Sequence, residues 1–294
     1  MAKECLMARM LWDEACRLDQ SLSSLGHYFS YPPEYAQTLT GGLTNRCWKV
    51  VLSENESYVW RPVTPITKAF SISRFQEFQI LNALKPTDLA PSAMYLNDHG
   101  LLVSWVEGST SNNDIKLDSL LKLLGRVHEF DATKLPIAPF NYTARVDHYW
   151  ILLNEQNKVE PFLSIYNQWR LAPNLVDVGQ VLCHLDLAGH NIVRTDAGNK
   201  IIDWEYATIT DPRLDLVLSA EMMSEKPLEV GYRYCQLRGI EDVDNWIEGI
   251  VVWRPRAKMM AMLWYLLAFQ LWGDEAYFLT ASQIAEELTV SSDP

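Results

Sequence analysis

Residues 183–206 read Cys-His-Leu-Asp-Leu-Ala-Gly-His-Asn-Ile-Val-Arg-Thr-Asp-Ala-Gly-Asn-Lys-Ile-Ile-Asp-Trp-Glu-Tyr. The β-branched pairs at 192–193 and 201–202, separated by turn-forming residues at 196–199, predict a β-hairpin. A hairpin folds its two ends back beside each other, so Asn191 and Asp203 are expected to be neighbours. Asp186 stands on the loop that leads into the first strand. Two carboxylates and one amide oxygen should therefore surround a small common volume.

Oxygen ligands of this kind suit Mg²⁺, which is commonly held by one or two protein carboxylates together with phosphate oxygens and water. Two other interpretations are open. His184, Asp186 and His190 are ligand types of a zinc or di-metal hydrolase, although such a site favours more histidine than the six in this chain. Alternatively, Asp186 and Asp203 are turn or cap residues without chemistry. The joint spacing, with Asp186 five residues before Asn191 and Asp203 twelve after it, favours the magnesium site.

The same spacing resembles the aminoglycoside phosphotransferase and choline kinase superfamily. Protein kinases carry His-Arg-Asp, four residues, Asn, and then Asp-Phe-Gly. Here Leu185 replaces the arginine and Asp203 opens Asp-Trp-Glu, as in the small-molecule kinases. The resemblance implies an α+β, protein-kinase-like fold with two lobes. The small lobe, a sheet plus a helix preceded by an N-terminal helix, would span residues 1–108, and the mainly helical catalytic and substrate-binding lobe would span 109–294.

The amino-acid composition and net charge argue against some classes of function. The 294 residues are 48% apolar and 21% charged, which is a normal globular composition. The net charge of −12 argues against a nucleic-acid-binding surface. Five widely spaced cysteines fit free thiols in a reducing cytoplasm. The longest uncharged apolar run, 259–269, is too short for a bilayer span and predicts a buried helix, so no membrane partner is expected.

Four small or polar residues between residues 38 and 46 suit a phosphate-covering turn: Gly41, Gly42, Thr44 and Asn45. Small residues let backbone N–H groups approach phosphate oxygens. By resemblance these residues bind the nucleotide, whereas taken alone they predict an ordinary β-turn. The pattern before them predicts one helix over residues 2–25, and strands are predicted over 47–52 and 57–62.

Arg61, in the second of these strands, occupies the place of the kinase lysine that meets the α- and β-phosphates. Glu77, in a helix predicted over 71–84, is by resemblance the carboxylate that pairs with it. The alternatives are a surface arginine and a solvated glutamate. The strand over 101–108 would end at the hinge, where Ser104 and Val106 hold the adenine through backbone groups.

Helices are predicted over 117–130, 147–153, 159–171 and 217–223, and throughout an aromatic-rich last third. His128 is expected to be a packing residue. The resemblance gives His184 and Asp215 structural roles, with Asp215 steadying the catalytic loop through hydrogen bonds. A helix-capping role for Asp215 is the alternative.

The implied reaction is transfer of the γ-phosphate of ATP to a substrate hydroxyl. Asp186 would accept or orient the hydroxyl proton. Asn191 and Asp203 would hold Mg²⁺, and catalysis would rest on positioning and charge neutralisation.

The acceptor is expected to be cationic, because aromatic faces and a nearby carboxylate bind such groups. Glu205, Trp253 and Trp264 are the candidate substrate residues, and a second metal is the competing role for Glu205. Three segments most resemble the bacterial thiamine kinase branch: the strand that contains Arg61, the hinge, and the Asp-Trp-Glu-Tyr motif. Choline or ethanolamine kinase is the alternative. A kinase-like protein that binds nucleotide without turnover is the alternative of another class. The oligomeric state and the base of the phosphate donor stay open.

Overall fold

The structure is a computed structural model that describes residues 9–39, 47–111 and 114–290. The chain forms two compact units. Unit 1 consists of the residues up to Thr110 together with Val193–Glu205, and unit 2 consists of Ser111–Ile192 and the residues from Tyr206 onward. Residues 193–205, which the sequence alone assigns to the second lobe, cluster with unit 1, and the predicted lobe boundary near Gly108 stays a prediction.

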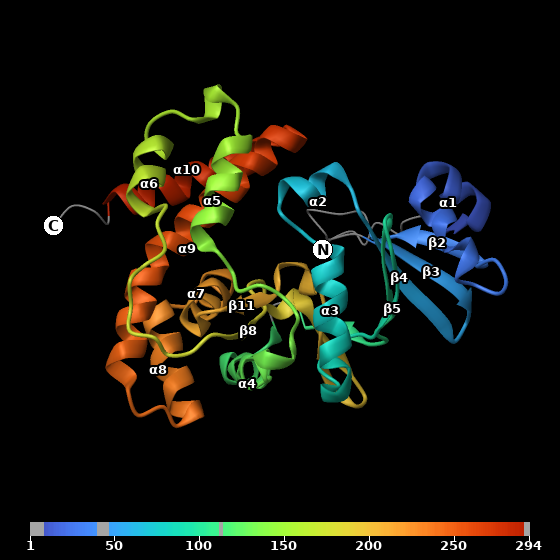
Figure 1. Cartoon of the computed structure of the whole chain (residues 1–294), viewed down its shortest axis with the longest axis horizontal. Helices are drawn as coiled ribbons and strands as arrows, with labels where there is room; N and C mark the ends of the chain where they lie inside the picture. The colour runs from blue at the N-terminus through green and yellow to red at the C-terminus, as the bar shows by residue number, and fades with distance from the viewer. Residues whose placement is uncertain (1–8, 40–46, 112–113, 291–294) are drawn as a thin grey trace. The chain divides into compact units, whose positions relative to one another are not determined.

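Unit 1 is built on a six-stranded antiparallel sheet with the order β1-β2-β3-β4-β6-β5 (Figure 1). Its strands are β1 (Met10–Leu11), β2 (Tyr35–Thr38), β3 (Trp48–Ser53), β4 (Glu56–Pro62), β5 (Ala93–Asn97) and β6 (Gly100–Ser104). In β4 the register sets Trp60 opposite Leu102 and Arg61 opposite Leu101. Because side chains alternate along a strand, Trp60 and Arg61 point to opposite faces of the sheet.

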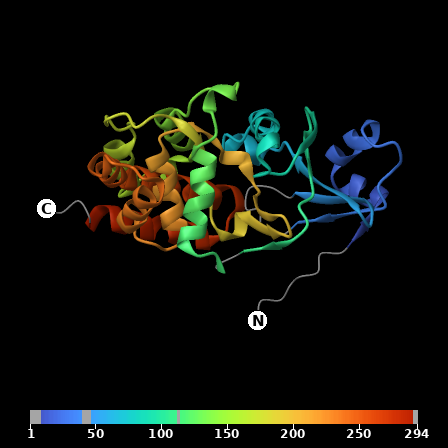
Figure 2. The ribbon, with the colours of Figure 1, turned by 90° about the horizontal axis from the view of Figure 1, so that it is seen from below.

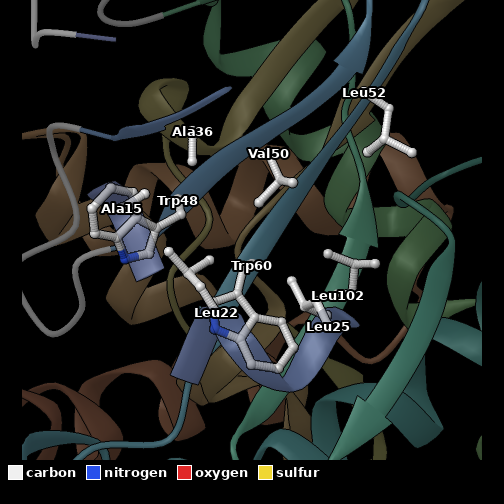
Figure 3. Packing of buried hydrophobic residues seen from close by; sticks show 9 residues of the cluster. All are labelled: Ala15, Leu22, Leu25, Ala36, Trp48, Val50, Leu52, Trp60 and Leu102. Carbon is white, nitrogen blue, oxygen red and sulfur yellow. The ribbon is translucent and has the colours of Figure 1, made fainter. Parts of the chain in front are cut away.

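One face of this sheet carries a hydrophobic core whose nine residues are shown in Figure 3. The segment that covers it is α1 (Trp12–Leu18) followed by the 3₁₀ helix η1 (Gln20–His27). The prediction of one continuous helix over 2–25 is therefore wrong for the described residues. Asp19 interrupts it: its extended backbone ends α1, and its carboxylate accepts from Ser21 N at 2.9 Å and from Trp48 Nε1 at 2.9 Å. The residue at which the helix ends is therefore hydrogen-bonded to a side chain of the sheet.

Unit 1 also contains two α-helices beside the sheet, α2 (Pro65–Ala69) and α3 (Arg74–Leu84). Ser73 caps α3 by accepting from Gln76 N at 3.2 Å, so this helix begins three residues later than predicted. The predicted hairpin is present as β9 (Ile192–Thr195) and β10 (Gly198–Ile201), and β9 also pairs with β7 (Ser109–Thr110). Ile201 N donates to Leu89 O at 2.7 Å, which ties the hairpin to the rest of unit 1.

Unit 2 is mostly helical (Figure 2). Its α-helices are α4 (Leu117–His128), α5 (Tyr142–Leu152), α6 (Phe162–Trp169), α7 (Pro212–Met222), α8 (Pro227–Arg238), α9 (Val243–Trp272) and α10 (Glu275–Val290). The long helix α9 packs against α5, α6, α7, α8 and α10, which explains why its segment at 259–269 is so apolar. A second sheet consists of two strands, β8 (Val181–Cys183) and β11 (Thr208–Thr210). The predicted catalytic loop follows directly after β8. None of the helices in the described part of the chain is long and apolar enough to cross a membrane.

The remaining single-turn 3₁₀ helices are η2 (Lys85–Thr87), η4 (Ala132–Lys134), η5 (Glu155–Asn157), η6 (Gly189–Asn191) and η7 (Trp204–Tyr206). Two of them carry predicted site residues, because η6 ends at Asn191 and η7 contains Glu205.

Candidate active site

The predicted catalytic loop of unit 2 brings Asp186 and Asn191 together. The loop leaves β8 at Cys183 and closes into the single turn η6. Asn191 Nδ2 donates to the backbone O of Asp186 at 2.9 Å and to its Oδ2 at 3.1 Å. Asp186 is half-buried, and Asn191 is buried. These two contacts fix the direction of the Asp186 carboxylate through the neighbouring amide.

The backbone of this loop adopts a conformation that non-glycine residues rarely use. Leu185 has a φ of 61°, in the left-handed region, immediately before Asp186. Asp215, which is fully buried in α7, holds the turn: Oδ2 accepts from His184 N at 2.8 Å, and Oδ1 accepts from Leu185 N at 2.9 Å. The hydrogen bonds predicted from Asp215 to the loop are therefore present. The helix cap of α7 is instead Asp211, whose side chain accepts from Arg213 N, so capping as the role of Asp215 is wrong.

The Asp215 carboxylate is stabilised as an anion. Burial raises its pKa, but the hydrogen bond and charge of His128 and the contacts from His184 lower the pKa by more, so that it falls below the ordinary value. His184 is itself fully buried and meets Asp215 through its backbone N–H. His128 is a buried histidine, as expected, and it is bonded to the same carboxylate at 3.1 Å.

In unit 1, five charged residues form a compact group that we call the ionic cluster: Arg61, Arg74, Glu77, Asp203 and Glu205. Arg61 Nε lies 2.8 Å from Glu77 Oε1, which is the predicted pair; this N–H does not point at the oxygen, so the contact is an ion pair rather than a hydrogen bond. Arg61 Nη2 also donates to Asp203 Oδ1 at 2.5 Å and to Glu205 Oε2 at 2.9 Å. Arg74 Nη1 lies 2.5 Å from Glu77 Oε2 and 3.1 Å from Glu205 Oε2.

Burial decides between the interpretations that the sequence left open for two of these residues. Arg61 is 7% exposed and Glu77 is 2% exposed, so neither is a surface residue. On the opposite side of α3, the apolar Phe75 is 61% exposed. The helix thus buries part of its charged side, because that side completes the ionic cluster.

Arg74 is the member of the ionic cluster that sequence reasoning missed. The signal was present, since Arg74 and Glu77 stand three apart and therefore share one helix face. Two guanidinium groups face three carboxylates, which leaves a single excess negative charge when all are ionised. Such a cluster suits an additional cation.

Asp203 differs from the other acids of the ionic cluster. Its side chain is 27% exposed, and its backbone is left-handed with a φ of 63°. Trp204 follows it, fully buried, and donates from Nε1 to Ile201 O at 2.8 Å, which fastens the turn after β10. The partly exposed Asp203 is the carboxylate of the cluster that a ligand reaches most easily. The predicted proximity of Asn191 and Asp203 spans the two units and stays a prediction.

Glu205 is placed where two arginines share one of its oxygens, and it is 8% exposed. Its pKa is raised, because burial and the charge of Asp203 outweigh the lowering by Arg74 and Arg61. This placement assigns Glu205 a local role that the sequence did not suggest, as the bridge between the two guanidinium groups. Its predicted contact with substrate stays a prediction.

The predicted hinge follows β6. Ser104 N donates to Ser92 O at 2.9 Å, so this backbone donor is used inside unit 1. Val106, just past the strand, is half-buried and has no hydrogen-bond partner among the described residues. Of the two predicted hinge residues, Val106 therefore keeps its backbone groups available. The predicted phosphate-covering residues Gly41, Gly42, Thr44 and Asn45 lie outside the described residues.

The two tryptophans predicted to bind substrate lie in different surroundings within unit 2. Trp253 is buried, donates from Nε1 to Asp211 Oδ2 at 2.9 Å, and packs edge-on against Tyr142. It borders a cavity of about 450 Å³ that is also lined by Phe140, Gln180 and the 172–177 segment near the start of β8.

Trp264 belongs to a different group of rings, which we call the aromatic cluster: Tyr206, Trp264, Tyr265, Trp272 and Tyr277. Trp264 Nε1 donates to the Tyr206 hydroxyl at 3.0 Å, and its ring centroid lies 5.2 Å from that of Tyr265 and 6.2 Å from that of Tyr277. Burial raises the pKa of Tyr265, and the negative charge of Asp186 raises it further. Tyr265, which sequence reasoning did not single out, therefore lies within electrostatic range of Asp186.

Comparisons with known proteins agree with this geometry. Residues 36–248 match the Phosphotransferase enzyme family. Thiamine kinase of Salmonella paratyphi B is 24% identical over 203 residues, which cover 69% of this chain and 73% of that protein. Among solved structures, choline kinase LicA from Streptococcus pneumoniae superposes with a TM-score of 0.72 at 22% identity, covering 95% of this chain and 99% of that one. Plasmodium vivax ethanolamine kinase gives a TM-score of 0.70 at 20% identity, covering 96% and 89%.

The solved structures confirm the predicted kinase-like fold, with an antiparallel sheet in the small part and helices in the large part. The family match covers well over half of the chain and includes Arg61, the catalytic loop and Asp203. The chain therefore belongs to the phosphotransferase enzyme family and is a small-molecule kinase that acts on hydroxyl groups.

Proposed function

We propose that this kinase transfers the γ-phosphate of ATP to the hydroxyl of a small cationic alcohol, with thiamine as the preferred acceptor. The observation that carries the proposal is that Tyr265, which packs edge-on against Trp264 in the aromatic cluster, lies within electrostatic range of Asp186. The expected proton acceptor and these rings belong to the same unit. A cation held against such faces would place its hydroxyl near the carboxylate.

In this proposal, the ionic cluster binds the phosphate donor. Arg61 is the candidate for the nucleotide phosphates, since a guanidinium binds phosphate oxygens in a bidentate fashion. Glu77 and Glu205 would orient it, and Arg74 would hold both acids in place. The choline kinase LicA has been solved with AMP, which supports an adenine nucleotide here. The backbone of Val106 is the candidate for contact with the base.

The donor set fits Mg²⁺. Asp203 supplies a partly exposed carboxylate beside buried acids, and Asn191 donates through Nδ2 to Asp186, so that its amide oxygen is the atom to offer a metal. Carboxylate and amide oxygens are hard ligands of the type that Mg²⁺ accepts. When bound, the ion would neutralise charge on the phosphates.

Asp186 would accept the hydroxyl proton of the acceptor, or orient that proton, as the phosphoryl group is transferred. Its carboxylate is held by Asn191, and its backbone is set by the left-handed Leu185 that Asp215 stabilises. The loop is thereby fixed before substrate arrives, which suits a reaction that depends mainly on positioning.

The acceptor is proposed to be a cation because the aromatic cluster offers ring faces near a negative charge. Each cation–ring contact contributes about 0.5–2 kcal/mol, depending on desolvation. Thiamine is favoured over choline because its flat pyrimidine would also stack on rings such as Trp264, and because the thiamine kinases are relatives of this chain. Choline or ethanolamine is the second candidate, since the solved neighbours include kinases for both. The free cysteines among the described residues support a cytoplasmic location.

A turnover screen with Mg·ATP over thiamine, choline, ethanolamine and an aminoglycoside tests the proposal. Thiamine should give the highest kcat/KM. Trp264→Leu should raise the KM for the cationic acceptor by about 2–30-fold, which is the equivalent of 0.5–2 kcal/mol. Trp150→Leu is the matched control, because Trp150 stacks on Tyr166 between α5 and α6 and is outside the aromatic cluster. Equal KM changes in both variants would remove the aromatic cluster from acceptor binding.

A further inference from the structure

Arg61 is paired with the carboxylate that is proposed to bind the metal. Its Nη2 lies 2.5 Å from Asp203 Oδ1, although the two residues are 142 positions apart in sequence. Both residues belong to unit 1. Burial lowers the pKa of Arg61, but the negative charges of Asp203 and Glu77 raise it by more, and the effect of Asp203 is the larger of the two. Asp203 is therefore the strongest charge partner of Arg61.

The other contacts of this guanidinium lie on its buried side. Nε is 2.8 Å from Glu77 Oε1, and Nη2 also donates to Glu205 Oε2 at 2.9 Å. The side chains of both glutamates are at most 5% exposed, whereas that of Asp203 is 27% exposed. Among the described residues, Arg61 Nη1 has no hydrogen-bond partner. The guanidinium can thus leave Asp203 and stay anchored to the two glutamates, so that Nη1 and the second hydrogen of Nη2 become available to another anion.

A divalent cation and Arg61 compete for the same carboxylate. One oxygen of Asp203 already has a positive charge 2.5 Å away, and a cation on the other oxygen would be repelled by that charge. The single excess negative charge of the ionic cluster is also smaller than the two charges of such an ion. Nucleotide phosphates change this balance, because they offer Arg61 another anion and offer the metal further oxygen ligands.

We propose that Arg61 is an internal counter-ion of Asp203: it keeps free divalent cations off this carboxylate until nucleotide phosphates take over its donors. The metal therefore enters with the nucleotide and not before it. The inference rests on the proposed function for the metal role of Asp203 and the phosphate role of Arg61. It needs no particular acceptor, and metal binding without nucleotide tests it without turnover.

Two double variants test the counter-ion role at constant net charge. Arg61→Gln/Glu77→Gln removes Arg61 together with its buried partner, and it leaves Arg74 paired with Glu205 at 3.1 Å. Arg74→Gln/Glu77→Gln is the matched control, because it keeps the contact between Arg61 and Asp203. Each variant loses one arginine and one glutamate, so a change in the overall field of the ionic cluster is common to both.

The probe is Mn²⁺, which accepts the same oxygen ligands as Mg²⁺, titrated without nucleotide and followed by electron paramagnetic resonance of the free ion. Arg61→Gln/Glu77→Gln should bind Mn²⁺ about tenfold more tightly than wild type, the equivalent of about 1.4 kcal/mol, whereas the control should stay within about threefold. Adding Asp203→Asn to each protein identifies Mn²⁺ that binds elsewhere on this acidic chain. The affinity for Mn·ATP should change in the opposite direction and become about tenfold weaker in Arg61→Gln/Glu77→Gln, because the phosphates lose their guanidinium.

A single variant tests the release of Asp203 while the buried pairs stay intact. Asp203→Asn keeps the shape of the side chain, and asparagine tolerates the left-handed backbone at this position. Because Asp203 and the phosphates compete for Arg61, metal-free ATP, measured by calorimetry with EDTA, should bind Asp203→Asn about tenfold more tightly than wild type. In the Arg61→Gln/Glu77→Gln background, the same substitution should change this affinity by less than about threefold.

Equal Mn²⁺ affinities in the two double variants would overturn the inference, because the contact between Arg61 and Asp203 would then have no effect of its own. The inference would equally fail if Asp203→Asn did not bind metal-free ATP more tightly, and this comparison decides if the double variants do not fold. A wild-type protein that binds Mn·ATP but turns over none of the acceptors would contradict the proposed function, and the Mn²⁺ titrations would still decide whether Arg61 guards Asp203.

Discussion

Replacing Glu77 with glutamine should destabilise unit 1 by about 3–5 kcal/mol, the range for breaking a buried ion pair by removal of one partner. Glu77 is 2% exposed and meets two cations, Arg61 Nε at 2.8 Å and Arg74 Nη1 at 2.5 Å. Glutamine has nearly the same shape, so the change removes charge and leaves packing almost intact. One of its two oxygens becomes an NH₂ group, which then faces an arginine donor.

The size of this loss in stability follows from two opposing free-energy contributions, the attraction between charges and the cost of burying them. At an effective dielectric constant of 20, unit charges about 4 Å apart attract by about 4 kcal/mol, and Glu77 takes part in two such pairs. Burying its carboxylate costs several kcal/mol, which the glutamine variant recovers in part. Asp203 and Glu205 still neutralise the arginines to some extent. The difference is a few kcal/mol, which agrees with the measured range for buried pairs.

The assay is hydrogen exchange as a function of urea, read by mass spectrometry on peptides that cover β3, β4 and α3. Peptide-level data are needed because two compact units can unfold separately, and a single global midpoint would mix them. Glu54→Gln is the matched control, since Glu54 is exposed in the turn between β3 and β4 and should stay within about 0.5 kcal/mol of wild type. A loss below about 1 kcal/mol in Glu77→Gln would refute the reasoning that the ionic cluster is tightly paired.

Three further predictions concern the reaction and its pH dependence. Asp186→Asn should lower kcat by about 10²–10⁴-fold with little change in Mg·ATP affinity by calorimetry, and near-wild-type turnover would remove Asp186 from the mechanism. Asp203→Ala should abolish metal-dependent ATP binding, and Asn191→Ala should weaken it less, because a neutral amide oxygen contributes less to the ion; unchanged binding in Asp203→Ala would contradict the metal assignment. Because the folded pKa of Asp215 is lowered, its stabilising contribution is complete above about pH 4 and is lost as the pH falls through the folded pKa. Asp215→Asn should therefore flatten the acid side of a plot of unfolding midpoint against pH, and an unchanged slope would show that Asp215 is not the anion inferred here.

Residues close in sequence were the easiest part of the fold and site to predict. The hairpin β9–β10 follows from two β-branched pairs and a turn, and the pairing of Asp186 with Asn191 follows from a spacing of five residues. The prediction of one helix over 2–25 failed because a side chain distant in the sequence determines where the helix ends. Asp19 leaves the helix to bind Trp48, which is 29 residues away. Periodicity alone contains no information about that partner.

The ionic cluster shows a second limit. Arg61 and Glu77 could be named because their positions relative to the catalytic loop resemble those of known kinases, whereas Arg74 and the bridging role of Glu205 depend on how far-separated segments pack. Arg74 and Glu205 are 131 residues apart in sequence. Tyr265 was missed for a similar reason, since one tyrosine in an aromatic-rich helix carries no local sign that it lies near Asp186.

The most direct test of the proposed function is an internal competition for Mg·ATP among acceptors in one reaction. Thiamine, choline and a neutral alcohol such as a nucleoside would be mixed at equal concentrations below their KM values, and the phosphorylated products would be quantified to give ratios of kcat/KM. Both cations should exceed the neutral alcohol, with thiamine ahead of choline, because the aromatic cluster and Asp186 favour a positive charge. A neutral alcohol that is phosphorylated with the highest kcat/KM would contradict the account, and a clear lead of choline over thiamine would replace the proposed acceptor with the second candidate.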